Sequence, residues 1–268
     1  MLNSIKIKDD FISSSKVNDD IKIDFANKND LFSINSIKFN IYKKTDLEIQ
    51  FDSKSESKLD LFFHIHKNAS LKIIEKREGK YAKVQYKFYV DEDASVESYK
   101  MYNASDCNEL CLVNLNGKNA KFKSDYKVIT TEEEKYSFLI NHNASKTESD
   151  LSFSAVNISD GKITTNMTSL VPTDKEDCLV NQSGRIINFN DKSCVLKPNL
   201  IIESDSCIAN HSAAIGNFSD EEIFYMMSRG IDEKNTINLL TKGFLLNNLE
   251  SQIDFQKHVK KVVSSYWR

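Results

Sequence analysis

The sequence predicts a mainly β protein that folds as a β-helix, or solenoid, followed by a small helical unit. The first observation is a series of short segments, from about residue 47 to residue 215, in which apolar residues occupy every second position. These segments recur at intervals of roughly 10–16 residues. The second is the scarcity of tight-hairpin dipeptides, with NG at 116–117 and DG at 160–161. A β-sandwich has similar strand spacing and is the alternative.

A third observation is the recurrence of small residues beside the strands. A β-helix stacks its coils without closed hairpins, and it accepts Asn and small residues at its corners. The triplet NAS recurs at 68–70, 103–105 and 143–145.

Composition limits the class of protein. A chain of 268 residues suits one large domain with small appendages. A net charge of −3 gives no electrostatic reason to expect a nucleic-acid partner. The sequence has no apolar run of membrane-spanning length, and its N-terminus lacks the apolar core of a signal peptide. A cytoplasmic location without membrane contact is therefore expected.

The elements are expected in the following order. Residues 1–45 should form an N-terminal α/β segment, in which residues 20–25 alternate as a strand does. Residues 46–216 should form the β-helix core, because β-branched and aromatic residues are common there and Asn, Asp, Gly, Ser and Lys separate the segments. Its alternating segments include LKIIEKREG, KVQYKFYV, SVESYKMYN, ELCLVNLNG, FKSDYKVIT, YSFLINHNA, DLSFSAVN, KITTNMTSLV, CLVNQSGRIINF, CVLKPNLIIES and CIANHSAAIG.

Residues 217–268 are expected to form a helical domain. Ser219 and Glu222 make a capping box at the start of the first helix, and Gly230 ends it. Asp232 can cap a second helix, and a third amphipathic segment runs from about residue 250 to residue 266.

The first of these helices carries more apolar surface than one face can hold. The residues at 223–226 are consecutive, so part of this surface should lie outside the local core. The structural alternative is that the helices pack against the end of the β-helix and cap it.

No familiar catalytic or nucleotide-binding motif is present. The sequence has no GxGxxG, GxxxxGK[ST], HExxH or CxxC, and no recognisable nucleophile motif. We therefore expect a chain that is not an enzyme by itself and that carries no nucleotide site.

The cysteines are five in number and irregularly spaced, which argues against a disulfide framework. Cys178, Cys194 and Cys207 follow one another at intervals interpreted as close to one coil, so that stacking could bring their thiols together. Thiolates suit iron and Fe–S clusters. A column of small core residues is the alternative, and spacing alone favours it. Cys107 and Cys111 are expected to be buried small residues.

Two histidine positions invite a functional interpretation. His64 and His66 lie two apart in FFHIHKNAS, so on a strand both point to one face, a spacing that can bind a metal. A solvated strand face is the commoner outcome. His211 stands alone where the strand pattern changes to helix, and from the residues alone it is interpreted as a hydrogen-bonded core histidine.

Three stretches carry a resemblance to a known family. ANHSAAIGNFSDEEIFYMMSRGI at 209–231 with the following LLTKGFLLNNL, KPNLIIESD at 197–205, and NHNASKTESDLSFSAVNISDGKI at 141–163 resemble the SufB/SufD family of iron–sulfur cluster assembly scaffolds. The resemblance covers residues 141 to 250 well and the upstream strands loosely.

The resemblance implies a right-handed parallel β-helix with a terminal helical domain. It also implies work with a SufC-like ABC-type ATPase, which holds the nucleotide, and pairing with a second SufB/SufD-like subunit or with itself. The cargo would be an Fe–S cluster. A non-metal β-solenoid binding or adaptor module is the alternative function. A carbohydrate-active enzyme would need clustered carboxylates on neighbouring coils, and no convincing set is present.

Position by position, His211 matches a histidine implicated at the dimer interface where a cluster assembles, and so becomes a candidate iron ligand. Ser212 follows it where SufB-like chains carry a glutamate, which resembles SufD-like chains. The essential SufB-like cysteine falls near Ser183 and is missing, which puts independent sulfur acceptance in doubt. The remaining candidate cluster ligands are Cys178, Cys194 and Cys207. The candidate ATPase contacts are Ile223, Phe224, Tyr225, Met226 and Arg229.

Overall fold

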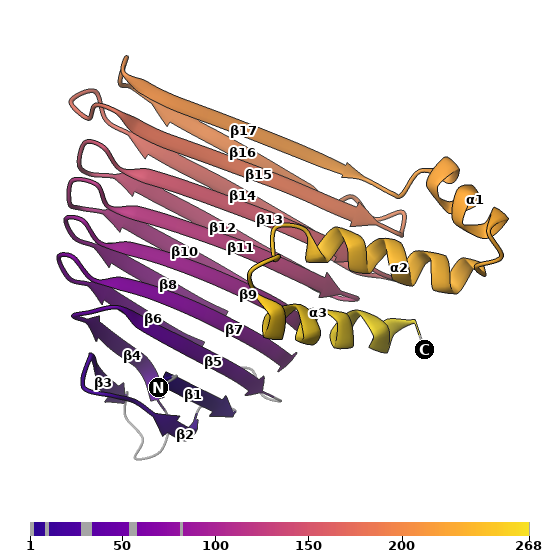
Figure 1. Ribbon diagram of the computed structural model, residues 1–268, viewed down its shortest axis with the longest axis horizontal. Helices are drawn as coiled ribbons and strands as arrows, with labels where there is room; N and C mark the ends of the chain where they lie inside the picture. Colours follow the sequence, from indigo (N-terminus) through magenta and orange to yellow (C-terminus); the bar gives the residue numbers. More distant parts are fainter. Residues whose placement is uncertain (1–2, 9–10, 28–33, 54–57, 81–82, 268) are drawn as a thin grey trace.

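The computed structural model describes residues 3–8, 11–27, 34–53, 58–80 and 83–267. Its strands form two sheets that face each other along the length of the molecule (Figure 1). In spatial order, sheet A contains β17 (Cys207–Gly216), β15 (Cys178–Asn188), β13 (Glu148–Asn157), β11 (Lys121–Thr130), β9 (Ser95–Ser105), β7 (Ser70–Lys80), β5 (Thr45–Ser53), β1 (Asn3–Lys8) and β2 (Phe11–Lys16). Sheet B contains β16 (Val195–Ile202), β14 (Lys162–Val171), β12 (Glu133–His142), β10 (Asn108–Leu115), β8 (Lys83–Val90), β6 (Lys58–Ile65), β4 (Ile34–Ile41) and β3 (Ile21–Asn27).

From β4 onward, successive strands alternate between the two sheets, and neighbours within each sheet are parallel. One coil therefore consists of two strands, and equivalent positions such as Leu71, Val96 and Phe122 are about one coil apart. This is a parallel β-solenoid, so the predicted fold is confirmed and the sandwich alternative is wrong. The predicted interval of roughly 10–16 residues corresponds to one strand rather than to one coil.

The corners of the coils explain the abundance of Asn and Asp. A column of residues with positive φ runs down one corner, a conformation that Asn and Asp tolerate better than most side chains. Backbone N–H groups in this column donate to carbonyl groups of the next coil, from Asn68 to Glu92 and from Asp93 to Lys118. The members of this column are Asn68, Asp93, Asn119, Lys146 and Asp177.

The core lies between the sheets and follows the alternation of the sequence. Phe39, Phe63 and Phe88 stack on one another through three coils, with ring centroids 4.5 Å and 4.8 Å apart. Each of these rings is at most 1 % exposed. Burial of such side chains in every coil supplies the main stabilisation of the solenoid.

The described part of residues 1–45 differs from the α/β segment that the sequence suggested. It consists of strands, and β3 overlaps the strand expected at residues 20–25. β1 pairs in parallel with β5, and β4 pairs in parallel with β6. The apolar residues Ile5 and Ile7 alternate and are buried, so these strands extend the solenoid core instead of forming a separate unit.

The helical region contains α1 (Asp220–Ser228), α2 (Glu233–Leu246) and α3 (Ile253–Tyr266). The capping box is present, because the Glu222 N–H donates to Ser219 Oγ at 3.2 Å and the Ser219 N–H donates to Glu222 Oε2 at 3.0 Å. None of the helices in the described chain is long and apolar enough to cross a bilayer.

The helices α2 and α3 cover the flank of sheet A and leave the end of the solenoid uncovered (Figure 1). Side chains such as Phe255 and Val259 pack against Tyr99 and Ile129 on the outer face of this sheet. The alternative in which the helices cap the end of the solenoid is therefore wrong for α2 and α3. The apolar residues on the outer face of sheet A, among them Tyr99, Met101 and Ile129, provide the surface that the helices cover.

Candidate functional site

The last coil, made of β16 and β17, leaves one end of the solenoid open. β17 pairs with β15 and β16 pairs with β14, and within the described chain no strand pairs with their outer edges. Ile208 is 63 % exposed and Ile215 is 44 % exposed on β17. An open edge with exposed apolar side chains can accept another chain.

His211 lies in the middle of this open edge. It pairs in register with Gln182 of β15, and strand alternation places it on the same face as Cys207 and Ala209, which pack against the core. The His211 side chain is nevertheless exposed, because no further coil of the described chain stacks on this edge. In the described part of the chain the ring has no hydrogen bond. The alternative of a hydrogen-bonded core histidine therefore does not describe this residue.

Two of the three candidate cysteines are neighbours. Cys178 and Cys207 are register partners at the start of β15 and β17. Cys178 is buried, with Sγ 3.3 Å from Thr147 Oγ1. Cys207 is partly exposed. Its partial burial is the main cause that raises the pKa of its thiol, and the nearby Cys178 raises it further. His211 is four residues further along the strand, about 13 Å away.

Cys194 lies at the opposite end of the strands. Its Sγ accepts hydrogen bonds at 3.4 Å from Asn157 Nδ2 and from the Ile163 N–H. The structure therefore does not bring the three thiols together. The reason is that one coil contains two strands running in opposite directions, so a spacing of 13 or 16 residues moves a side chain to the other sheet or the other end.

One chain does not complete a metal site at His211. Among the described His, Cys, Asp and Glu side chains, no group of three ligand atoms gathers at the last coil. Ser183, where the resemblance places the missing cysteine, alternates with the buried Gln182 and so lies on the outer face of sheet A. There it lines a shallow pocket with Ser212, Arg185 and Phe244. The last coil thus presents the imidazole of His211 and the thiol of Cys207 at two separate places.

The structure divides the candidate ATPase contacts between two sides of α1. Phe224 is 73 % exposed and Tyr225 is 58 % exposed. Ile223 packs against the helical core, and Met226 is also partly buried. Arg229 is exposed, with its guanidinium 5.3 Å from the Tyr225 ring centroid. The expectation that these consecutive side chains divide between a local core and the surface is confirmed.

A buried ionic network was not foreseen from the sequence. Arg77 lies 2.9 Å from Glu75 and 3.1 Å from Glu109, and Lys100 Nζ lies 3.4 Å and 3.5 Å from the same two carboxylates. All four side chains are at most 1 % exposed. Tyrosine hydroxyls complete the network, with Tyr86 donating to Glu75 and Tyr102 and Tyr126 donating to Glu109.

A thiol and a third carboxyl adjoin this network. Arg77 Nη1 donates to Cys107 Sγ at 3.0 Å, and the Cys107 N–H donates to Glu134 Oε2 at 3.1 Å. Burial raises the pKa of the Cys107 thiol despite the nearby guanidinium, so the thiol stays protonated at neutral pH. Burial also raises the pKa of Glu134 to about 8 and that of Cys111 to about 12. The expected burial of both cysteines is confirmed.

The alternation of inward and outward positions along the strand is the sequence signal for this network. In LKIIEKREG, the inward positions that begin with Leu71 and Ile73 continue through Glu75 and Arg77. Charged residues at inward positions of a regular strand indicate a polar interior with paired charges.

Comparison with known proteins agrees with this geometry. The sequence matches the family described as SUF system FeS cluster assembly, SufBD core domain, over residues 47–244. No curated protein matches the sequence significantly. The match covers the solenoid from β5 to β17 and continues through α1 into α2. The chain therefore belongs to the SufBD core-domain family and has a role in SUF-type iron–sulfur cluster assembly.

Proposed function

We propose that this chain is a non-enzymatic scaffold subunit of a SUF complex, on which an Fe–S cluster is built or handed over with the help of an ABC-type ATPase. The observation that carries the proposal is the exposed His211 at the centre of an open solenoid edge, in a chain of the SufBD family. A neutral imidazole is a good ligand for iron. The cluster is the cargo of this chain and not a resident cofactor.

The open edge is the proposed contact with a second scaffold subunit, either another copy of this chain or a relative. Strands of the partner would cover Ile208 and Ile215, which are exposed in the single chain. Because His211 and Cys207 lie about 13 Å apart on the last coil, a cluster bound at His211 would take its remaining ligands from the partner. Cys178 and Cys207 lie together at the start of their strands and Cys194 lies at the opposite end, so none of the three thiols adjoins His211.

The exposed side of α1 is the proposed contact with the ATPase. Phe224 and Tyr225 are exposed neighbours on a helix with no fully buried residue, and exposed aromatic side chains of this kind are common anchors of protein interfaces. Arg229 beside Tyr225 adds a donor for a carboxylate.

Co-purification with the cognate ABC-type ATPase tests this function. The tagged full-length chain should retain the ATPase, and the double variant Phe224→Ala/Tyr225→Ala should lose it while keeping its melting temperature. Ile253→Ala is a matched control, because Ile253 is 66 % exposed on a neighbouring helix. The proposal fails if the wild-type chain does not retain the ATPase, or if the double variant binds it as well as Ile253→Ala does.

A binding or adaptor module without a metal role is the second candidate. The incomplete ligand set at the last coil and the serine at position 183 favour it. Such a module would bind the ATPase and carry neither iron nor sulfide after anaerobic purification.

A further inference from the structure

His64, His66 and Asp91 form a compact group on sheet B, far from the open edge. His64 lies in β6, His66 follows the end of β6, and Asp91 follows β8 in the next coil. β6 is five strands from β16 in the sheet order, or about 24 Å along the stack. This group is therefore separate from the candidate cluster site.

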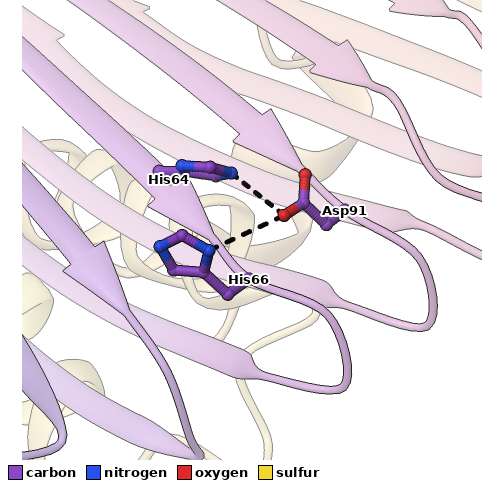
Figure 2. A group of neighbouring side chains, drawn as sticks. All are labelled: His64, His66 and Asp91. Carbon is purple, nitrogen blue, oxygen red and sulfur yellow. Dashed lines mark hydrogen bonds and ion pairs between the residues drawn. The ribbon is translucent and has the colours of Figure 1, made fainter.

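The three side chains point to one place. His64 Nε2 lies 3.0 Å from Asp91 Oδ2, and His66 Nδ1 lies 3.8 Å from the same oxygen. Figure 2 shows both rings directed at this oxygen from the neighbouring strand. Among the described residues, this is where three potential ligand atoms lie within 4.8 Å of one another.

The environment of His66 points to a ligand. Its Nδ1 lies 3.8 Å from Asp91 Oδ2, which is too long for a hydrogen bond, and Nδ1 has no other hydrogen-bond partner within the described residues. Nε2, on the side of the ring away from Asp91, is buried and also has no partner there, so no hydrogen bond fixes the ring. The ring is held between the ring of Tyr42, with centroids 4.4 Å apart, and that of His64, with centroids 3.9 Å apart. A structural histidine pairs at least one ring nitrogen, whereas this ring directs Nδ1 toward a shared carboxylate without bonding to it.

The backbone holds the group in place. The His66 N–H donates to Ile41 O and the Asp91 N–H donates to Ile65 O, both at 3.0 Å. These are bonds between coils, so the ligand spacing is fixed by the solenoid itself.

We propose that His64, His66 and Asp91 bind one divalent first-row transition metal ion. Two ligands at ordinary bond lengths around such an ion lie about 3.3 Å apart, between the two observed separations. Two imidazoles with one carboxylate suit Zn²⁺ or Fe²⁺ rather than Mg²⁺ or Ca²⁺. The side chains are 41 %, 30 % and 33 % exposed, which leaves room for water as a further ligand. The ion takes the place of the hydrogen bond between His64 Nε2 and Asp91, and the neutral His64 ring then carries its single proton on Nδ1.

The test is Zn²⁺ titration of the full-length, chelator-treated chain by calorimetry, without ATPase or sulfide. One Zn²⁺ should bind per chain, and Asp91→Asn, His64→Gln and His66→Gln should each weaken binding roughly 100-fold. Circular dichroism verifies that each variant is folded. Glu92→Gln is the matched control, because it removes the same charge from the adjacent residue without removing a ligand, and it should bind like the wild type.

A second control separates this site from the open edge. The variant His211→Gln/Cys207→Ser should retain the Zn²⁺ site, and bound Co²⁺ should show visible absorption without a thiolate charge-transfer band. The inference is overturned if no Zn²⁺ binds, if Asp91→Asn binds as tightly as Glu92→Gln, or if binding is lost in the His211/Cys207 variant.

Discussion

The guanidinium of Arg77 donates to the thiol of Cys107 at 3.0 Å in the closed interior of the solenoid, where both side chains are buried. The contact belongs to a network in which two cations, Arg77 and Lys100, balance two carboxylates, Glu75 and Glu109. Removal of water from four charges is costly, so each depends on its partners. The network makes the middle of the solenoid sensitive to single substitutions.

Lys100→Met should destabilise the protein by about 3–5 kcal/mol, because it leaves an uncompensated carboxylate in the core. Urea denaturation of the two proteins measures this difference. Lys121→Met is the control, since Lys121 pairs with Glu148 on the surface and its loss should cost less than about 1 kcal/mol. Equal effects of the two substitutions would contradict the assignment of a buried, balanced network.

Glu134→Gln should remove a pH dependence of stability. Burial raises the pKa of Glu134 from 4.5 to about 8, so the folded protein keeps a proton that the unfolded chain loses above 4.5. This contribution is full below pH 4.5 and declines as the pH rises to about 8, with a limiting slope of about 1.4 kcal/mol per pH unit. Urea unfolding of both proteins from pH 5 to pH 9 should show the variant gaining stability relative to the wild type. Parallel curves would refute the raised pKa.

His142 should contribute to acid sensitivity with the opposite sign. Its ring is buried between Thr147 Oγ1 at 2.7 Å and Ser149 Oγ at 2.9 Å, and burial lowers its pKa from 6.5 to about 4. The unfolded chain therefore takes up a proton first, and stability declines as the pH falls from 6.5 toward 4. His142→Gln should show a shallower loss between pH 7 and pH 5 than the wild type. An identical slope in His142→Gln and the wild type would be evidence against this account.

Two glycine-to-alanine substitutions should change the stability of the protein in opposite directions. A Cβ at Gly117 would lie 1.9 Å from the Glu92 backbone nitrogen, so Gly117→Ala must displace the neighbouring corner and should cost about 1–3 kcal/mol. A Cβ at Gly243, within α2, meets nothing within 4 Å, so Gly243→Ala should stabilise by about 0.5–1 kcal/mol. Thermal unfolding of the two variants checks both signs. A neutral Gly117→Ala would show that the corners are not closely stacked.

The local pattern of the sequence predicts much of the fold. The capping box at Ser219 and Glu222, and the alternation that buries Leu71 and Ile73, depend on neighbouring residues and are readable directly. The coil length is a long-range property. The sequence shows strands but does not show that two of them make a coil. The possible stacking of Cys194 with Cys178 and Cys207, which takes each interval as one coil, therefore does not occur.

In the candidate sites, too, local pattern is readable from the sequence and long-range pairing is not. His64 and His66 are visible as a pair because they are two residues apart, whereas Asp91 joins them through the pairing of β6 with β8. The exposure of His211 depends on the absence of another coil beyond β17 among the described residues. Side-chain pattern alone gave the opposite expectation of a core histidine.

The most direct test of the central claim measures iron and acid-labile sulfide in the proposed complex of this chain with an ABC-type ATPase and a second scaffold subunit, purified anaerobically. The account predicts both iron and sulfide with the wild-type chain, and a several-fold loss of both with His211→Ala at unchanged melting temperature and ATPase binding. Sulfide distinguishes a cluster from an ion bound at His64, His66 and Asp91. A complex without sulfide, or a His211→Ala complex with the full amount, would contradict the role of the open edge in cluster assembly.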